Sequence, residues 1–141
     1  MNANPTFAAS VAPALQSHDV RAPGRDRASV TTLDTFDAYR IGLDACRFCA
    51  AIAVVLSANL RDQLLRASSS VVLNIAEGFG SSSRGVKRRH YDIARGSAIE
   101  CVAILDLGSA LRGELTREAA VARSLFVRAA MMLARLEARF R

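Results

Sequence analysis

The side chains that could carry chemistry in the central part of this chain are three cysteines and one histidine. Cys46 and Cys49 stand three residues apart, and His90 and Cys101 follow further along the sequence. Thiolates and imidazoles are the usual ligands of zinc. His90 and Cys101, however, fall eleven residues apart in one predicted helix, which separates them by about 16 Å along its axis. They cannot share one ion, so we interpret the cysteines as buried structural residues and predict no metal site.

Other catalytic patterns are also incomplete. A redox Cys-x-x-Cys pair opens a helix after a strand, whereas this pair lies in mid-helix. The segment 78–80 lacks both the strand and the Gly-Lys-Ser/Thr sequence of a nucleotide loop. The serines at 81–83 have no acid–base partner nearby, and His90 is predicted to be a hydrogen-bonded histidine at the edge of the core. We therefore predict no catalytic residue, no cofactor and no enzymatic activity.

The composition indicates one basic helical domain. The 141 residues include 19 Lys and Arg against 13 Asp and Glu, a net charge of +6, and 51% are hydrophobic, which suffices for one core. All three prolines lie in the first 23 residues, so later helices can run without interruption. The positive charge favours nucleic acid as a partner, and an anionic membrane surface is the second choice. The alternative is that the charge only keeps the protein soluble.

The location predicted from the sequence is the cytoplasm. The chain has three cysteines, an odd number, and they lie in predicted apolar helices. This usage is typical of a reducing compartment and not of a set of disulfides. No signal-peptide pattern opens the chain. The longest apolar run, residues 48–56, is far shorter than the roughly 20 residues that cross a bilayer.

Hydrophobic periodicity predicts an all-α, antiparallel up-down four-helix bundle over residues 33–141, about 30 Å long, preceded by a flexible tail at 1–32. The second helix is predicted from about Leu60 to Gly78, with Gly78 as its left-handed cap. A serine among 81–83 is expected to cap the third helix, which ends near Arg112, and the fourth starts at Thr116.

Two of these helices carry patterns that predict surfaces. In the second half of the first helix, the positions of its charged stripe are taken by the apolar residues Ala51, Val54 and Val55. This part of the helix is therefore apolar on nearly all sides, which predicts a subunit interface there. The third helix is predicted to face inward through Val86, Ile93, Ser97, Ile104 and Leu111. The fourth helix has its core seam at Ala122, Phe126, Ala129, Leu133, Leu136 and Phe140, and a basic stripe at Arg117, Arg128, Arg135 and Arg139.

The third helix also carries a basic line with an aromatic residue in it. Arg84, Arg88, Tyr91 and Arg95 fall on one stripe opposite the predicted inner line, flanked by Lys87. Cations in the first turns of a helix are disfavoured by about 0.3–1 kcal/mol each because the helix dipole is positive there. A bound phosphate would reverse that sign. We therefore predict a nucleic-acid surface here, against the plainer interpretation of a solvated outer face.

Several polar residues lie where the second and third helices are predicted to pack against each other. Asn74, Ser97 and Glu100, with Glu77 just before the turn, are expected to tie these helices together, because buried polar groups need partners. The segments 74–78 (NIAEG) and 93–100 (IARGSAIE) resemble a bacterial four-helix-bundle family. That family is named for reading frames within intervening sequences of large-subunit ribosomal RNA genes, and it is related to the accessory variability determinants of diversity-generating retroelements.

The resemblance covers about residues 36–112. Its signature falls on Asn74, Glu77, Gly78, Arg95, Gly96, Ser97 and Glu100, which we interpret as mainly structural. It implies a compact bundle, a ring-like homopentamer, a basic surface suited to RNA or DNA and, in the retroelement relatives, a reverse-transcriptase partner. The leading hypothesis is an oligomeric nucleic-acid-binding accessory protein, and the alternative is a protein-interaction scaffold that binds no nucleic acid.

Overall fold

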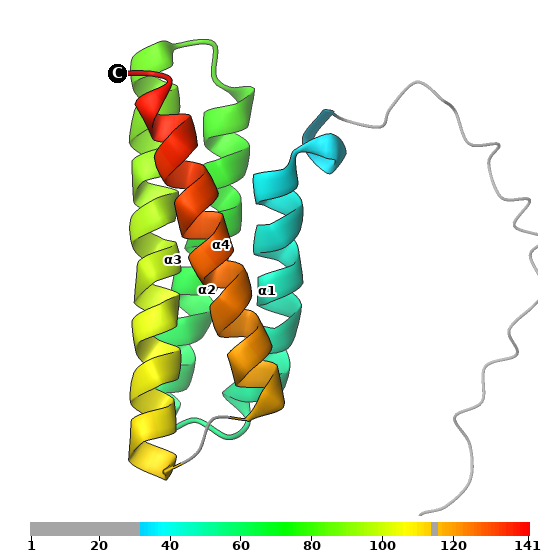
Figure 1. Cartoon of the computed structure of the whole chain (residues 1–141), viewed down its shortest axis with the longest axis vertical. Helices are drawn as coiled ribbons and strands as arrows, with labels where there is room; N and C mark the ends of the chain where they lie inside the picture. Colours follow the sequence, from blue (N-terminus) through cyan, green and yellow to red (C-terminus); the bar gives the residue numbers. More distant parts are fainter. Residues whose placement is uncertain (1–31, 114–115) are drawn as a thin grey trace, which may run out of the picture.

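The computed structural model describes residues 32–113 and 116–141 and contains five helical elements. They are η1 (Thr32–Thr35), α1 (Asp37–Ala53), α2 (Ala58–Gly80), α3 (Arg84–Arg112) and α4 (Arg117–Ala138). Successive long helices pack side by side and α4 closes the square against α1, as Figure 1 shows. The predicted antiparallel up-down four-helix bundle is confirmed. The tail predicted at 1–32 lies outside the described residues except for Thr32.

The cores of α2 and α4 follow the predicted pattern. Leu60, Leu64, Val71 and Ile75 are buried on α2, together with Ser68. Along α4 the first four residues of the predicted seam are fully buried, and Leu136 and Phe140 pack against the core at its edge. No helix within the described residues is long and apolar enough to cross a membrane.

The predicted inner line of α3 is wrong for three of its five residues. Val86, Ile93 and Leu111 are exposed, Leu111 to 72%, while Ser97 and Ile104 are buried. The buried face consists instead of Tyr91, Ala94, Ala98, Cys101, Leu105 and Gly108. Most of these residues are small, so α3 approaches its neighbours closely and its larger aliphatic side chains are rotated outward.

Three of the helix ends follow from local sequence. Ser83 caps α3 by accepting a hydrogen bond from the Val86 amide, and Thr116 caps α4 by accepting one from Ala119. Gly113 ends α3 in the left-handed conformation, with a φ of 79°. At the end of α1, Ala51 and Val54 are exposed, but the helix stops at Ala53 and Val55 packs against the core.

Gly78 is not the left-handed cap that the sequence suggested. The helix α2 continues to Gly80, and the only glycine with positive φ in the described residues is Gly113. A Cβ atom on Gly78 would lie 2.6 Å from Cε1 of Tyr91. The glycine is therefore required by the close approach of the Tyr91 ring to the α2 backbone.

This contact predicts the effect of adding one methyl group. Gly78→Ala should lower the free energy of unfolding by roughly 1–3 kcal/mol, because either the Tyr91 ring or α2 must shift. Urea denaturation of the purified variant measures the change. Gly96→Ala is the matched control, since a Cβ there meets nothing within 4 Å, and alanine should leave stability unchanged or raise it by up to ~1 kcal/mol. Equal effects at both positions would contradict this role of Gly78.

Candidate nucleic-acid interface

An aromatic cluster joins the ends of all four helices at one end of the bundle. Phe36 caps the start of α1, Phe79 lies at the end of α2, Tyr91 is on α3 and Phe140 follows α4. Phe36 lies 5.1 Å from Phe79 and 6.4 Å from Tyr91 between ring centroids, and Tyr91 lies 5.9 Å from Phe140. Aromatic pairs at such distances add to the stability of simple burial. The cluster thus ties together the parts of all four helices at the end of the bundle where Arg84 and Lys87 lie.

Tyr91 cannot act as the predicted base-stacking residue. It is 3% exposed and lies in the hydrophobic core, and burial raises the pKa of its hydroxyl. The reason is the glycine at position 78, which leaves the space that the ring fills. The basic line of α3 therefore lacks the surface aromatic residue that the sequence indicated.

Two cations of that line bind carbonyl groups of the protein itself. Arg84 donates from Nη2 to the Arg139 carbonyl oxygen at 3.0 Å, and Lys87 donates from Nζ to the carbonyls of Gly78 and Phe79 at 3.3 and 3.1 Å. Both side chains also lie over the ring of Phe140, at 5.7 and 6.0 Å. These carbonyls belong to the C-terminal ends of α2 and α4, where the helix dipole favours a cation. Arg84 and Lys87 therefore need no external anion to stabilise them.

Arg88 and Arg95 face a buried carboxylate that the sequence analysis missed. Glu137 on α4 is 5% exposed. Its oxygens lie 3.5 Å from Arg95 Nε, 3.9 Å from Arg88 Nε and 3.2 Å from Arg141 Nη2. Arg95 also pairs with Asp92 at 2.7 Å. Arg88 and Arg95 of the line predicted on α3 thus face the end of α4, although Arg88 remains about half exposed. The available signal was the position of Glu137, four residues after the seam residue Leu133 and four before Arg141.

The basic stripe predicted on α4 is exposed along its whole length. Its residues, Arg117, Arg128, Arg135 and Arg139, are called the α4 arginine row below. None of the four has an ion-pair partner among the described residues, and Arg89 on α3 is exposed in the same way. Their spacings of 11, 7 and 4 residues place them on one side of the helix, spread over about 33 Å of its axis. The described structure thus leaves four exposed arginines along α4 without a carboxylate partner.

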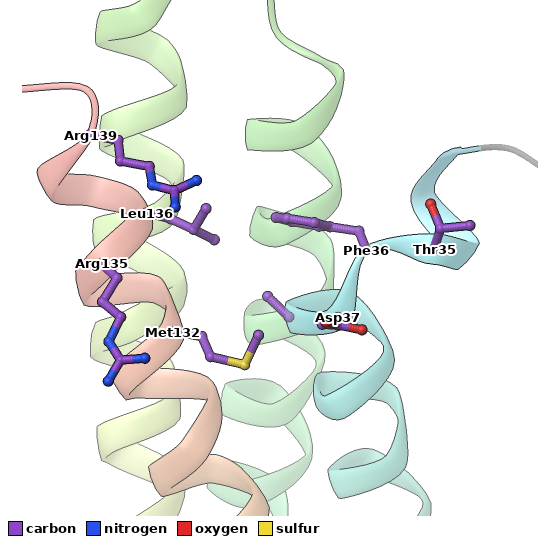
Figure 2. Close-up of a pocket in the computed structure, with 8 residues that line it drawn as sticks. Thr35, Phe36, Asp37, Met132, Arg135, Leu136 and Arg139 are labelled. Carbon is purple, nitrogen blue, oxygen red and sulfur yellow. The ribbon is translucent and has the colours of Figure 1, made fainter.

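A pocket of about 360 Å³ opens beside the last two arginines of the row, between the start of α1 and the end of α4. Figure 2 shows Phe36 reaching in from α1, with Met132, Leu136, Arg135 and Arg139 along α4. Asp37 lies on the α1 side and its carboxylate is 3.8 Å from Arg40. The pocket therefore combines apolar walls with two guanidinium groups at its edge.

The predicted polar tie between α2 and α3 is confirmed for Asn74 and Ser97. His90 Nδ1 lies 3.0 Å from Asn74 Oδ1, and the hydroxyls of Ser70 and Ser97 are 2.9 Å apart. The expectation that His90 is hydrogen-bonded at the edge of the core is also confirmed. The signature residues Glu77, Gly96 and Glu100 are exposed on the outer side of these helices. The prediction that Glu77 and Glu100 help to tie α2 to α3 is therefore wrong, because both lie outside the contact.

The three cysteines are free thiols in or beside the core. Cys49 and Cys101 are buried and Cys46 is partly buried, where its Sγ donates to the Ser68 carbonyl. Burial raises the pKa of all three thiols, that of Cys49 to about 12. No group of three or more metal-ligating side chains is assembled in the described residues.

These raised pKa values predict slow thiol chemistry. At pH 8 the Cys49 thiol should be a thiolate in only about one molecule in ten thousand, because its pKa lies well above that pH. Native protein mixed with an aromatic disulfide reagent should therefore release little chromophore. Addition of guanidinium chloride should expose all three thiols at once. Rapid labelling of Cys49 or Cys101 in the folded protein, located by mass spectrometry, would show that the core is more open than described.

Comparison with known families agrees with the signature in α2 and α3. The search of curated proteins finds no match. The sequence model of the family described as 23S rRNA-intervening sequence protein matches residues 38–134, which run from the first turn of α1 into α4 and include the NIAEG and IARGSAIE segments. The match covers more than half of the chain, and the chain therefore belongs to the family of 23S rRNA-intervening sequence proteins.

Proposed function

We propose that this protein binds RNA or DNA through the phosphate backbone as a non-enzymatic accessory factor. The observation that carries this proposal is the α4 arginine row, four exposed guanidinium groups on one side of a helix with no ion-pair partner among the described residues. Neutralising phosphates with such cations releases counterions, which supplies most of the affinity of non-specific binding. The net charge of +6 acts in the same direction.

The residues predicted on α3 take a secondary part in this proposal. Arg88 is about half exposed beside the end of α4, and Arg89 is also exposed. Arg84 and Lys87 bind the carbonyl ends of helices, and Arg95 pairs with Glu137. Their charges therefore act on a polynucleotide mainly through the overall electrostatic field of the protein.

The proposed role involves no catalysis. The side chains that could act in catalysis have structural roles instead. His90 hydrogen-bonds to Asn74, Glu137 pairs with arginines, and burial raises the pKa of the thiols. Three free thiols also favour a reducing compartment, and we place the protein in the cytoplasm. The proposal of a reverse-transcriptase partner rests only on the resemblance to the retroelement proteins.

We also propose that the protein is a homo-oligomer, a pentamer by family resemblance. Among the exposed apolar side chains of the described residues, two groups are candidates for subunit contacts. Val54 beside Ala51 is 82% exposed at the end of α1, with Val55 packed behind it. The second group, the α2–α3 apolar face, consists of Leu73, Ile93, Leu107 and Leu111. A head-to-tail ring uses two different patches on each subunit, which fits this arrangement.

The alternative, a scaffold that binds no nucleic acid, draws support from one observation. Arg84 and Lys87 bind carbonyl groups at the ends of α4 and α2, so part of the basic surface is explained by helix capping alone. The scaffold predicts no binding of RNA or DNA near physiological salt.

Neutralising the row tests the main proposal. Arg128→Gln with Arg135→Gln should reduce affinity for a labelled RNA or DNA roughly tenfold or more at low salt, and should flatten the log–log salt dependence by about 1–2. Fluorescence anisotropy at several salt concentrations measures both quantities. Arg47→Gln is the control, because Arg47 is exposed on α1 but paired with Asp44 at 2.7 Å. Unchanged affinity and slope in the double variant, or no binding by the wild type, would favour the scaffold.

Charge introduced into the apolar patches tests the assembly. Val54→Asp should lower the mass measured by light scattering after size-exclusion chromatography, because a carboxylate would be buried without a partner in the contact. Leu73→Asp should do the same if the α2–α3 apolar face forms the other side of a ring. A wild-type protein that is monomeric at micromolar concentration would refute the assembly outright.

A further inference from the structure

We propose that the pocket between α1 and α4 receives an unpaired base of a single-stranded nucleic acid, while Arg135 and Arg139 bind the adjoining phosphates. This inference rests on the proposed function and specifies the ligand of the same surface. It assigns a base-binding role to Phe36, Met132 and Leu136, which the sequence analysis did not single out as surface residues.

The pocket has the composition that a base and its phosphate require. Its walls are the ring of Phe36 and the side chains of Met132 and Leu136, each partly buried against the core. Its volume of about 360 Å³ lies near the lower end of the range of small-molecule sites, about 300–1,000 Å³. Flat, apolar ligands suit such walls, and every base offers an apolar face for stacking or packing.

The positive charge beside these walls favours a ligand in which an anion is attached to the apolar base. Figure 2 shows the guanidinium groups of Arg135 and Arg139 extending from α4 alongside the pocket. Neither side chain has a hydrogen-bond or ion-pair partner among the described residues. The carboxylate of Asp37, which also lines the pocket, is held toward Arg40 on α1. A phosphate linked to the bound base would satisfy the two arginines with charge-assisted hydrogen bonds.

The rest of the row favours a strand over a free nucleotide or a duplex. Arg128 and Arg117 continue along α4 beyond the pocket, so cations are available for further phosphates of the same strand. In a duplex the bases are stacked and paired, and one would first have to be extruded at a cost in free energy. A single strand presents its bases without that cost. Alternating stacking surfaces and basic grooves are the common means of binding single strands.

The site is also preorganised by the core. The Phe36 ring packs on Phe79 at 5.1 Å between centroids and on Tyr91 at 6.4 Å. These contacts hold the ring before any ligand arrives, so little conformational entropy is lost on binding. Met132, which is flexible and polarizable, can adjust to purines and pyrimidines alike.

The test compares two labelled single strands that have the same length and the same phosphates, one of normal sequence and one with abasic sites throughout its centre. Wild-type protein should bind the normal strand about tenfold more tightly. Met132→Glu should abolish that preference, since a carboxylate would enter the pocket. Met131→Glu is the matched control, with the same charge change on the neighbouring exposed residue outside the pocket lining, and it should keep the preference. Circular-dichroism melting verifies that both variants fold.

Each outcome separates this inference from the proposed function. Equal affinity of wild-type protein for normal and abasic strands overturns the base site while leaving phosphate binding intact, and this comparison needs no variant. A preference that persists in Met132→Glu also overturns it. If a free nucleoside monophosphate competes at the same concentration as an unlabelled strand does, the pocket is a nucleotide site and the proposal of a single-strand ligand is refuted. Failure of both strands to bind at low salt would refute the proposed function itself.

Discussion

The contact between Tyr91 and Gly78 is the constraint on which this bundle and its surface depend. Because residue 78 has no side chain, the Tyr91 ring packs directly on the backbone of α2, and Phe36 and Phe140 pack on the same ring. One buried aromatic side chain on α3 thus touches the end of α2, the start of α1 and the residue that follows α4. The arginines near the end of α4, and the pocket beside them, are positioned by these contacts.

The electrostatics of the same end follow from helix geometry. The first turns of α3 contain four cations, and a cation there is disfavoured by about 0.3–1 kcal/mol. Arg84 and Lys87 offset this by reaching the carbonyl ends of α4 and α2, where the dipole favours them by a similar amount. Arg88 and Arg95 share the carboxylate of Glu137, and Arg95 also pairs with Asp92. The basic residues of α3 are therefore largely compensated within the protein, whereas the α4 arginine row is not, and that difference moves the candidate interface from α3 to α4.

The fold could be predicted from the sequence because its determinants are local. Large aliphatic residues at helical spacing mark the buried sides of α2 and α4, and Ser83, Gly113 and Thr116 act on their own helix ends. The errors arise where a contact joins distant residues. Alanine, glycine and cysteine on α3 give a weak hydrophobic signal although they form its closest packing, so Val86 and Ile93 were placed inside and Tyr91 outside. Glu137 has the spacing of a seam residue, but its pairing with Arg95 and Arg88, 42 and 49 positions earlier, joins residues that no local pattern connects.

The arrangement of the helices lets the two proposed surfaces operate together. In the square order of the bundle, which Figure 1 shows, the side formed by α2 and α3 lies opposite the side formed by α1 and α4, so a subunit contact through the α2–α3 apolar face would not itself cover the row and its pocket. A ring that repeats a weak phosphate-binding row several times gains affinity through effective concentration, since each bound row holds the strand near the next. In the proposed assembly, a modest basic surface on each subunit would then be sufficient for tight binding.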